Sequence, residues 1–159
     1  MKISIACVGK LKEKYLTEAV REYSKRLTRY CRPEILEVAD ESIPEKASEA
    51  QEQASRDKEG LRLLRQIPEN AWVITCEIGG KTPDSKEFAA LLQRWMSEGK
   101  SHLVFVIGGS TGLSGEVCRR SDFALSFSRM TFPHQLMRVI LLEQIYRAFR
   151  INAGEPYHK

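Results

Sequence analysis

Hydrophobic and polar residues change their spacing repeatedly along the chain, in the order typical of an α/β protein. Short apolar runs predict strands at about 3–8, 35–38, 71–76, 102–107 and 123–128. Apolar residues spaced three or four apart predict helices at about 11–30, 49–66, 85–96 and 115–120, and from residue 133 onward. Two of the apolar runs are almost continuous, which is typical of parallel strands covered on both faces. We therefore expect one α/β domain, residues 1–159, built on a parallel sheet.

The size and composition of the chain fit this single domain. Its 159 residues are 42% hydrophobic and 29% charged, which is typical of a globular protein rather than a disordered chain. No apolar run approaches the roughly 18 residues that a membrane span needs. The apolar stretch at residues 3–8 ends at Gly9-Lys10, too early for a signal peptide. We expect a cytoplasmic protein with no membrane segment.

The cysteines are too widely separated to suggest a disulfide framework or a metal site. None belongs to a CxxC pair, and free thiols in a reducing compartment are the simplest interpretation. The four are Cys7, Cys31, Cys76 and Cys118. The sequence therefore predicts that no metal is bound.

Charge is distributed unevenly along the chain. The net charge of +4 combines +6 over residues 1–32, −5 over residues 33–100 and +3 over residues 101–159. Two basic ends around an acidic middle suit a polyanionic partner that meets one surface of the protein. A solvated helix face would give the same totals, so charge alone leaves both interpretations open.

Three loops follow predicted strands and are candidate ligand-binding segments, because ligands of open α/β sheets bind at the carboxyl ends of strands. They cover residues 76–80, 108–115 and 127–133. The glycine-rich second loop could cradle a nucleotide-like molecule, since glycines allow close backbone approach. It matches neither the Walker pattern nor GxGxxG. On its own, a glycine-rich turn is more often structural.

The final predicted helix is apolar around most of its circumference. Pro133 suits its first position. His134 and Arg138 share one polar stripe, and Glu143, Arg147 and Arg150 fall on the opposite side. A subunit interface beside a polar cleft would accommodate both features, so we predict a symmetric dimer. The alternatives are a surface ion pair for Glu143 and Arg147, and a capping or core role for His134.

The chain ends in Pro156-Tyr157-His158-Lys159. Such a segment could be a frayed terminus. An aromatic, a histidine and a lysine so close together would equally serve to stack a nucleobase and hold its phosphate. The residues alone do not decide between these.

Several separated motifs occur in a fixed order along the chain: VGKLK at 8–12, FVIGGSTGL at 105–113, LSFSRMTFPHQ at 125–135, YRA at 146–148 and PYHK at 156–159. Together they closely resemble the RlmH family of bacterial ribosomal RNA large subunit methyltransferases. The resemblance extends over the whole chain and is weakest in its acidic middle.

This resemblance implies a SPOUT-class fold with a C-terminal trefoil knot, working as a homodimer. It further implies methylation of N3 of a pseudouridine in helix 69 of 23S rRNA, on the assembled ribosome, with S-adenosylmethionine as cofactor. Cys76 stands where relatives often have leucine, a change that we expect to be harmless. The implied cofactor-binding residues are Cys76, Gly108, Phe127, Ser128, Arg129, Met130, Thr131 and Phe132.

The implied chemistry assigns roles to the polar residues near the C-terminus. N3 must lose a proton during methyl transfer, so a base or an anion-stabilising cation is needed. We expect Arg147, oriented by Glu143, to stabilise the anion. Tyr157 and His158, from the partner subunit, would hold the base. His158 is the preferred proton acceptor and His134 the second choice.

Two other classes of protein are alternatives to a methyltransferase. A ribosome assembly factor without catalysis would have no affinity for S-adenosylmethionine. A Rossmann-like oxidoreductase would need the glycine fingerprint and a ribose-binding acid at the expected spacing, and the sequence has neither. Methyl transfer therefore remains the favoured prediction.

Overall fold

The computed structural model describes residues 1–158, in which helices and strands alternate. Serine and aspartate side chains begin two of the helices: Ser48 and Asp84 each form a capping box with the residue three positions later. The strands are β1 (Lys2–Val8), β2 (Arg32–Val38), β3 (Trp72–Lys81), β4 (His102–Ile107) and β5 (Phe123–Leu125). The helices are α1 (Lys14–Leu27), α2 (Glu49–Gln66), α3 (Ser85–Ser97), α4 (Gly115–Arg120) and α5 (His134–Asn152).

The strands form one parallel sheet in the order β2-β1-β4-β3-β5. β1 and β4 lie at its centre, and their side chains are almost all buried, as expected for strands covered on both faces. Because every strand runs in the same direction, the carboxyl ends of all five lie at one edge of the sheet. The predicted α/β class with a parallel sheet is confirmed.

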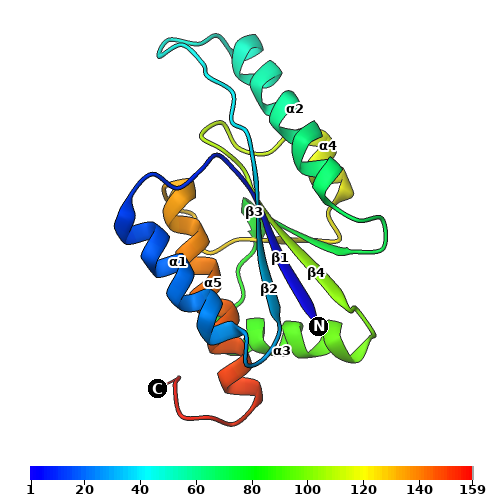
Figure 1. The fold of residues 1–159 in the computed structure, drawn as a ribbon. Helices are drawn as coiled ribbons and strands as arrows, with labels where there is room; N and C mark the ends of the chain where they lie inside the picture. Colours follow the sequence, from blue (N-terminus) through cyan, green and yellow to red (C-terminus); the bar gives the residue numbers. More distant parts are fainter. Residues whose placement is uncertain (159) are drawn as a thin grey trace.

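Helices cover both faces of the sheet (Figure 1). On one face α5 packs between α1 and α3, over a core that contains Phe105, Leu141 and Ile145. On the other face α2 and α4 pack over a smaller core around Val104 and Val117. No helix within residues 1–158 is both long and apolar enough to cross a membrane.

Several boundaries differ from the sequence prediction: α1 covers residues 14–27 instead of 11–30, and β2 begins at residue 32 instead of 35. Three further differences lie near the carboxyl edge of the sheet. β3 continues through the Gly79-Gly80 pair to Lys81, because an irregularity in its pairing lets Cys76 and Lys81 both face Leu125. β5 is correspondingly short and ends at Leu125. Pro133 precedes α5 rather than occupying its first turn, and its ψ of 130° is extended. The longer β3 brings Ile78 to the edge where the loops gather.

Candidate functional site

A pocket opens at the carboxyl ends of β3, β4 and β5. It encloses about 640 Å³, including its mouth. Its walls come from the segment after Thr75, the glycine-rich loop after β4 and the segment that joins β5 to α5. All the residues assigned to the cofactor by resemblance line it, except Arg129. These are Cys76, Gly108, Phe127, Ser128, Met130, Thr131 and Phe132.

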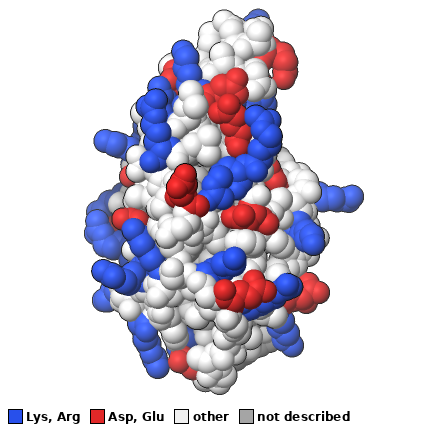
Figure 2. Space-filling view, turned by 90° about the vertical axis from the view of Figure 1, so that its right-hand side faces the viewer, with Lys and Arg blue, Asp and Glu red and all other residues white. Residues whose placement is uncertain are grey.

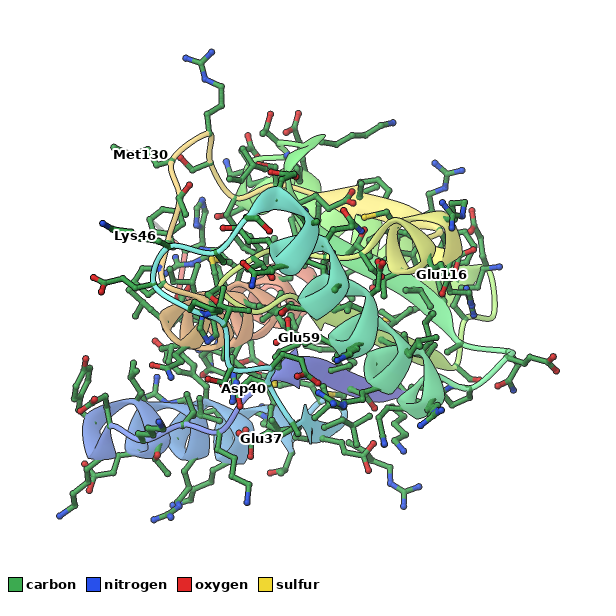
Figure 3. All side chains as sticks on the ribbon, turned by 90° about the horizontal axis from the view of Figure 1, so that it is seen from above. Glu37, Asp40, Lys46, Glu59, Glu116 and Met130 are labelled. Carbon is green, nitrogen blue, oxygen red and sulfur yellow. The ribbon has the colours of Figure 1, made fainter. Side chains whose placement is uncertain are left out.

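The segment between β5 and α5 is held in a compact turn. Ser126 Oγ donates to the carbonyl of Ser128, and the Met130 amide donates to Ser128 Oγ at 3.0 Å. Arg129 is exposed at this turn and does not line the pocket. Met130 is 72% exposed at the outside of the same turn, where Figure 3 shows it standing away from the body of the protein.

The glycine-rich loop turns back on itself beside the pocket. A Cβ atom at Gly108 would lie 2.7 Å from the backbone carbon of Gly112, so only glycine fits there without moving the loop. From behind, α2 braces the loop: Arg56 Nη1 donates to the carbonyl of Thr111 at 3.3 Å. Glu59 lies on the same helix (Figure 3). A Cβ atom at Gly109 would lie 3.0 Å from Glu59 Oε1, so this carboxyl packs against the loop.

Glu59 is a buried carboxyl, only 5% exposed. Its Oε2 accepts the amide of Glu41, and its Oε1 has no hydrogen-bond partner within residues 1–158. Burial raises the pKa of Glu59, and the neighbouring Asp40 and Glu41 carboxylates add to the rise. The brace behind the glycine-rich loop therefore contains a titratable group.

The inner wall of the pocket is mostly apolar. Ile107, Leu113, Leu125 and Met137 contribute to it. Burial raises the pKa of the Cys76 thiol to about 12, so this side chain is uncharged and adds to the apolar wall. Apolar surfaces beside exposed loop backbone can accommodate a flat heteroaromatic ring together with its hydrogen-bonding edge.

His134 begins α5 and lines the pocket. Burial lowers its pKa, and the charge of Arg138 lowers it further, so the imidazole is neutral at neutral pH. Arg138 is wholly buried, pairs with Glu37 and donates to the carbonyls of Val8 and Gly9. His134 is therefore a neutral imidazole whose helix is fixed to the sheet.

The other four residues predicted to act in catalysis form a second cluster, at the far end of α5. Arg147 Nη2 donates to Glu143 Oε1 at 2.6 Å, and Tyr157 Oη donates to the same oxygen at 3.1 Å. Arg147 Nη1 lies 3.3 Å from His158 Nδ1, and its guanidinium lies over the Tyr157 ring. We call Glu143, Arg147, Tyr157 and His158 the tail cluster.

The Glu143 carboxylate is the centre of the tail cluster. Its hydrogen bond raises the pKa of Arg147 above an already high range, so the guanidinium stays charged. Burial and Glu143 raise the pKa of Tyr157 to about 12, so the phenol stays protonated. The cluster thus presents a fixed cation beside an aromatic ring.

The tail folds back against α5 up to residue 158. Gly154 takes a φ of +66°, which reverses the chain after the helix. Glu155 then pairs with Arg150 and accepts from Tyr30 Oη at 2.8 Å, which fixes the turn. The frayed-end interpretation is wrong for residues 153–158, whereas Lys159 lies outside the described residues.

The two groups of predicted site residues do not meet within one chain. His134 and Arg147 are thirteen residues apart on one continuous helix, which at 1.5 Å per residue separates them by roughly 20 Å. The pocket lies at the first end of α5 and the tail cluster at the last. Within residues 1–158, no three His, Cys, Asp or Glu side chains are grouped to hold a metal ion.

Comparison with known proteins decides the family. A family model described as "Predicted SPOUT methyltransferase" matches residues 1–158. The chain belongs to the SPOUT methyltransferase family. A relative from Clostridium novyi (strain NT), named Ribosomal RNA large subunit methyltransferase H, is 58% identical over 159 residues, which is 100% of both chains. One of the same name from Bacillus thuringiensis (strain Al Hakam) is 56% identical over the same length. The resemblance seen in the motifs is confirmed.

Solved structures share the fold of this SPOUT methyltransferase. A probable methylase family protein from Haemophilus influenzae Rd KW20 superposes with a TM-score of 0.56 at 14% identity, covering 99% of this chain and 70% of that one. A putative methyltransferase from Legionella pneumophila, in complex with the bound cofactor SAM, gives 0.50 at 15% identity, covering 94% and 66%. At such low identities the similarity concerns the fold alone.

Some pocket residues of this SPOUT methyltransferase were not singled out from the sequence. Met137 lies one helical turn after His134, a spacing that would have pointed to it. Glu77 and Ile78 belong to the first candidate ligand-binding loop, residues 76–80. Only the continuation of β3 to Lys81 shows that their side chains reach the pocket. Glu59, which lies behind the glycine-rich loop and does not line the pocket, carried no sequence signal, because nothing local pairs α2 with that loop.

Proposed function

We propose that this protein transfers a methyl group from S-adenosylmethionine to large-subunit ribosomal RNA. In finer detail, we propose as its target N3 of a pseudouridine in helix 69 of 23S rRNA, on the assembled ribosome. The observation that carries the proposal is the pocket itself. It gathers seven of the eight residues that the family resemblance assigns to the cofactor, in a chain 58% identical to a relative named as an rRNA methyltransferase.

The walls of the pocket suit the chemistry of S-adenosylmethionine. Its apolar wall around Ile107, Leu113 and Leu125 would take the adenine ring, and the backbone after β5 would meet the ring edge. The tight turn at Gly108 would let the loop backbone approach the ligand closely. When bound, the cofactor would supply an electrophilic methyl group; a nitrogen would attack the methyl carbon in line as its bond to the sulfonium sulfur breaks and S-adenosylhomocysteine leaves.

A homodimer is part of this proposal. One chain holds its pocket and its tail cluster roughly 20 Å apart along α5. A second copy with its α5 antiparallel would place the partner's tail cluster beside the first copy's pocket. Two exposed apolar side chains line the pocket, Ile78 and Met130, and Leu136 is exposed in the first turn of α5; all three would be covered in such a dimer. A trefoil knot remains a prediction of the family resemblance.

Within such a composite site, the tail cluster would hold the target nucleotide. Tyr157 offers an aromatic face, and Arg147 stays charged next to it. As N3 loses its proton, negative charge develops on the ring, and Arg147 would stabilise it. Glu143 positions the Arg147 guanidinium by accepting hydrogen bonds from its Nε and Nη2 atoms. Most of the rate acceleration would come from holding N3 in line with the methyl carbon.

The hydrogen bonds distinguish His158 from His134 as candidate acceptors of the N3 proton. Arginine can only donate, so His158 Nδ1 accepts from Arg147, which leaves Nε2 as the nitrogen that carries the proton. In that form His158 donates to an oxygen of the base rather than taking the N3 proton. His134 is neutral, lines the pocket and retains an accepting nitrogen. We therefore favour His134 as the acceptor of the N3 proton, whereas the sequence had favoured His158.

The test is direct. The protein is incubated with labelled S-adenosylmethionine and ribosomes from a strain that lacks the gene, and the methylated nucleotide is mapped. We expect one labelled pseudouridine in helix 69. Calorimetry with S-adenosylmethionine tests the alternative of a non-catalytic assembly factor, which would bind none. Label in another nucleotide would overturn the finer assignment, and no label would overturn methyl transfer to rRNA.

A further inference from the structure

A row of basic side chains follows the outer face of α1. Lys14, Arg21 and Lys25 are exposed, and their spacing of seven and four residues puts them on one stripe of the helix. Exposed Lys10 and Lys12 extend it into the segment before the helix. We call these five residues the basic stripe.

The basic stripe is poorly neutralised by neighbouring carboxylates. Lys14 makes a long 3.8 Å contact with Glu18. The other four form no ion pair within residues 1–158. Some cations on other helix surfaces do find partners, as Arg94 does with Glu98. The stripe therefore keeps its positive charge facing solvent.

This arrangement is unfavourable for the isolated helix. Arg21 and Lys25 lie four residues apart in α1, so two like charges lie next to each other on the same face. Such a pair destabilises a helix. The helix dipole favours Lys25, which lies in the last turn, but it gives no reason for Arg21. A polyanion lying along α1 would relieve the repulsion.

The basic stripe leads away from the tail cluster. Arg26, at the last turn of α1, places its guanidinium 5.8 Å from the centre of the Tyr146 ring. Tyr146 in turn contacts Tyr157, with ring centres 5.0 Å apart. From Lys25 back to Lys14 the stripe spans about 16 Å at 1.5 Å per residue. It is long enough to face several consecutive phosphates of a strand whose base is held at the tail.

The opposite face of the protein differs in its charge pattern. Around α2 and α4, basic and acidic side chains are interspersed rather than separated (Figure 2). This face does carry exposed basic residues without an ion pair among the described residues, such as Lys58, Arg65 and Arg119. They are scattered among acids and lie across the sheet from α1, so they serve as a matched comparison.

We propose that the basic stripe of α1 binds the phosphate backbone of rRNA next to the nucleotide held by the tail cluster. This inference rests on the proposed function, and it adds the surface that orients the RNA. Contacts to phosphates fix position and register but carry no sequence information. The stripe therefore contributes affinity, and the tail cluster and pocket contribute the choice of nucleotide.

The test compares two triple variants with the full-length wild type. One removes the stripe charges (Lys12→Gln, Arg21→Gln and Lys25→Gln), and the control removes three charges from the other face (Lys58→Gln, Arg65→Gln and Arg119→Gln). Binding to ribosomes from a strain that lacks the gene is measured over a series of salt concentrations. Methylation kinetics and affinity for S-adenosylmethionine are measured in parallel.

For the stripe variant we expect ribosome binding to weaken about 10-fold or more at low salt. The plot of log affinity against log salt concentration has a negative slope, and this slope should become shallower by roughly 2, since each lost phosphate contact contributes about 0.7 to 0.9. KM should rise while kcat and cofactor affinity stay unchanged, and the control should behave like the wild type. An unchanged salt slope, or an equal loss in both variants, would overturn the inference. A wild type that binds ribosomes without methylating them would instead overturn the proposed function, and the binding comparison would still decide the role of the stripe.

Discussion

Arg138 of α5 and Glu37 of β2 form an ion pair of 2.8 Å in which the guanidinium is wholly buried. The same guanidinium donates to the carbonyls of Val8 and Gly9, where β1 ends. One side chain thus joins the start of α5 to the carboxyl ends of two strands. His134, one turn earlier, owes its place at the pocket to this anchor.

We predict that Arg138→Met destabilises the fold by about 3 kcal/mol, because two buried carbonyls and Glu37 lose their donor. Urea unfolding followed by circular dichroism measures the change. Arg94→Met is the control: it removes an exposed i,i+4 pair with Glu98 and should cost no more than about 0.5 kcal/mol. Equal effects of the two substitutions would show that Arg138 is no anchor.

The glycine at position 108 allows a second prediction. An added Cβ would press on the backbone of Gly112, which cannot yield as a side-chain end would. Gly108→Ala should therefore displace the loop and weaken binding of S-adenosylmethionine by about 10-fold or more, as overpacking by one methyl group typically costs 1–3 kcal/mol. Gly79→Ala is the matched control, since its added Cβ would meet no atom within 4 Å. Calorimetry showing equal affinity for both variants would contradict this prediction.

Much of this architecture could be predicted from the sequence, because apolar periodicity is a local property. The strand at His102–Ile107 was predicted with its observed bounds, and the loops after the strands were recognised as ligand-binding segments. Strand order was beyond reach, since the neighbours β1 and β4 are about a hundred residues apart in the chain. The same applies to Arg138, whose partners Val8 and Glu37 lie far away in sequence.

The site, too, was predictable only where its residues form a local motif. Residues 127–132 formed a recognisable motif, and apart from Arg129 they line the pocket. The order of the tail depends on Glu155 meeting Tyr30 and Arg150, contacts that no periodicity reveals. Helical spacing predicted that His134 and Arg147 lie on opposite sides of the last helix. Only the structure of the continuous helix α5 shows that they also lie at opposite ends of it.

The buried carboxyl of Glu59 makes stability depend on pH. Its pKa is raised in the folded protein, chiefly by burial, so the folded state holds the proton more tightly than the unfolded chain. The resulting stabilisation is complete below the ordinary pKa of about 4.5 and is lost as pH rises through the raised value. Glu59→Gln removes this term, so wild type should lose stability relative to the variant as pH increases from 4.5 towards neutrality. Urea unfolding at a series of pH values measures the difference, and parallel stability curves for the two proteins would contradict the prediction.

Deleting the tail separates its role from that of the pocket. Removal of residues 156–159 takes away Tyr157 and His158 but none of the pocket wall. We expect methylation of ribosomes to be abolished, while cofactor affinity measured by calorimetry stays within about threefold of the wild type. The thermal unfolding midpoint serves as the control for folding. Retained methylation would exclude the tail cluster from the site.

The strongest consequence of the separation along α5 concerns mixed dimers. Arg147→Ala should lower turnover by on the order of 100-fold, because it removes the cation proposed to stabilise the N3 anion. Gly108→Ala damages the pocket at the other end of the helix. If each site combines one chain's pocket with its partner's tail cluster, a dimer of the two variants contains one intact site. Equal mixing after subunit exchange should then restore about one quarter of wild-type activity, since half of the dimers are mixed and each has one working site of two. If pocket and tail cluster of the same chain acted together, every site would carry a defect and mixing would restore nothing.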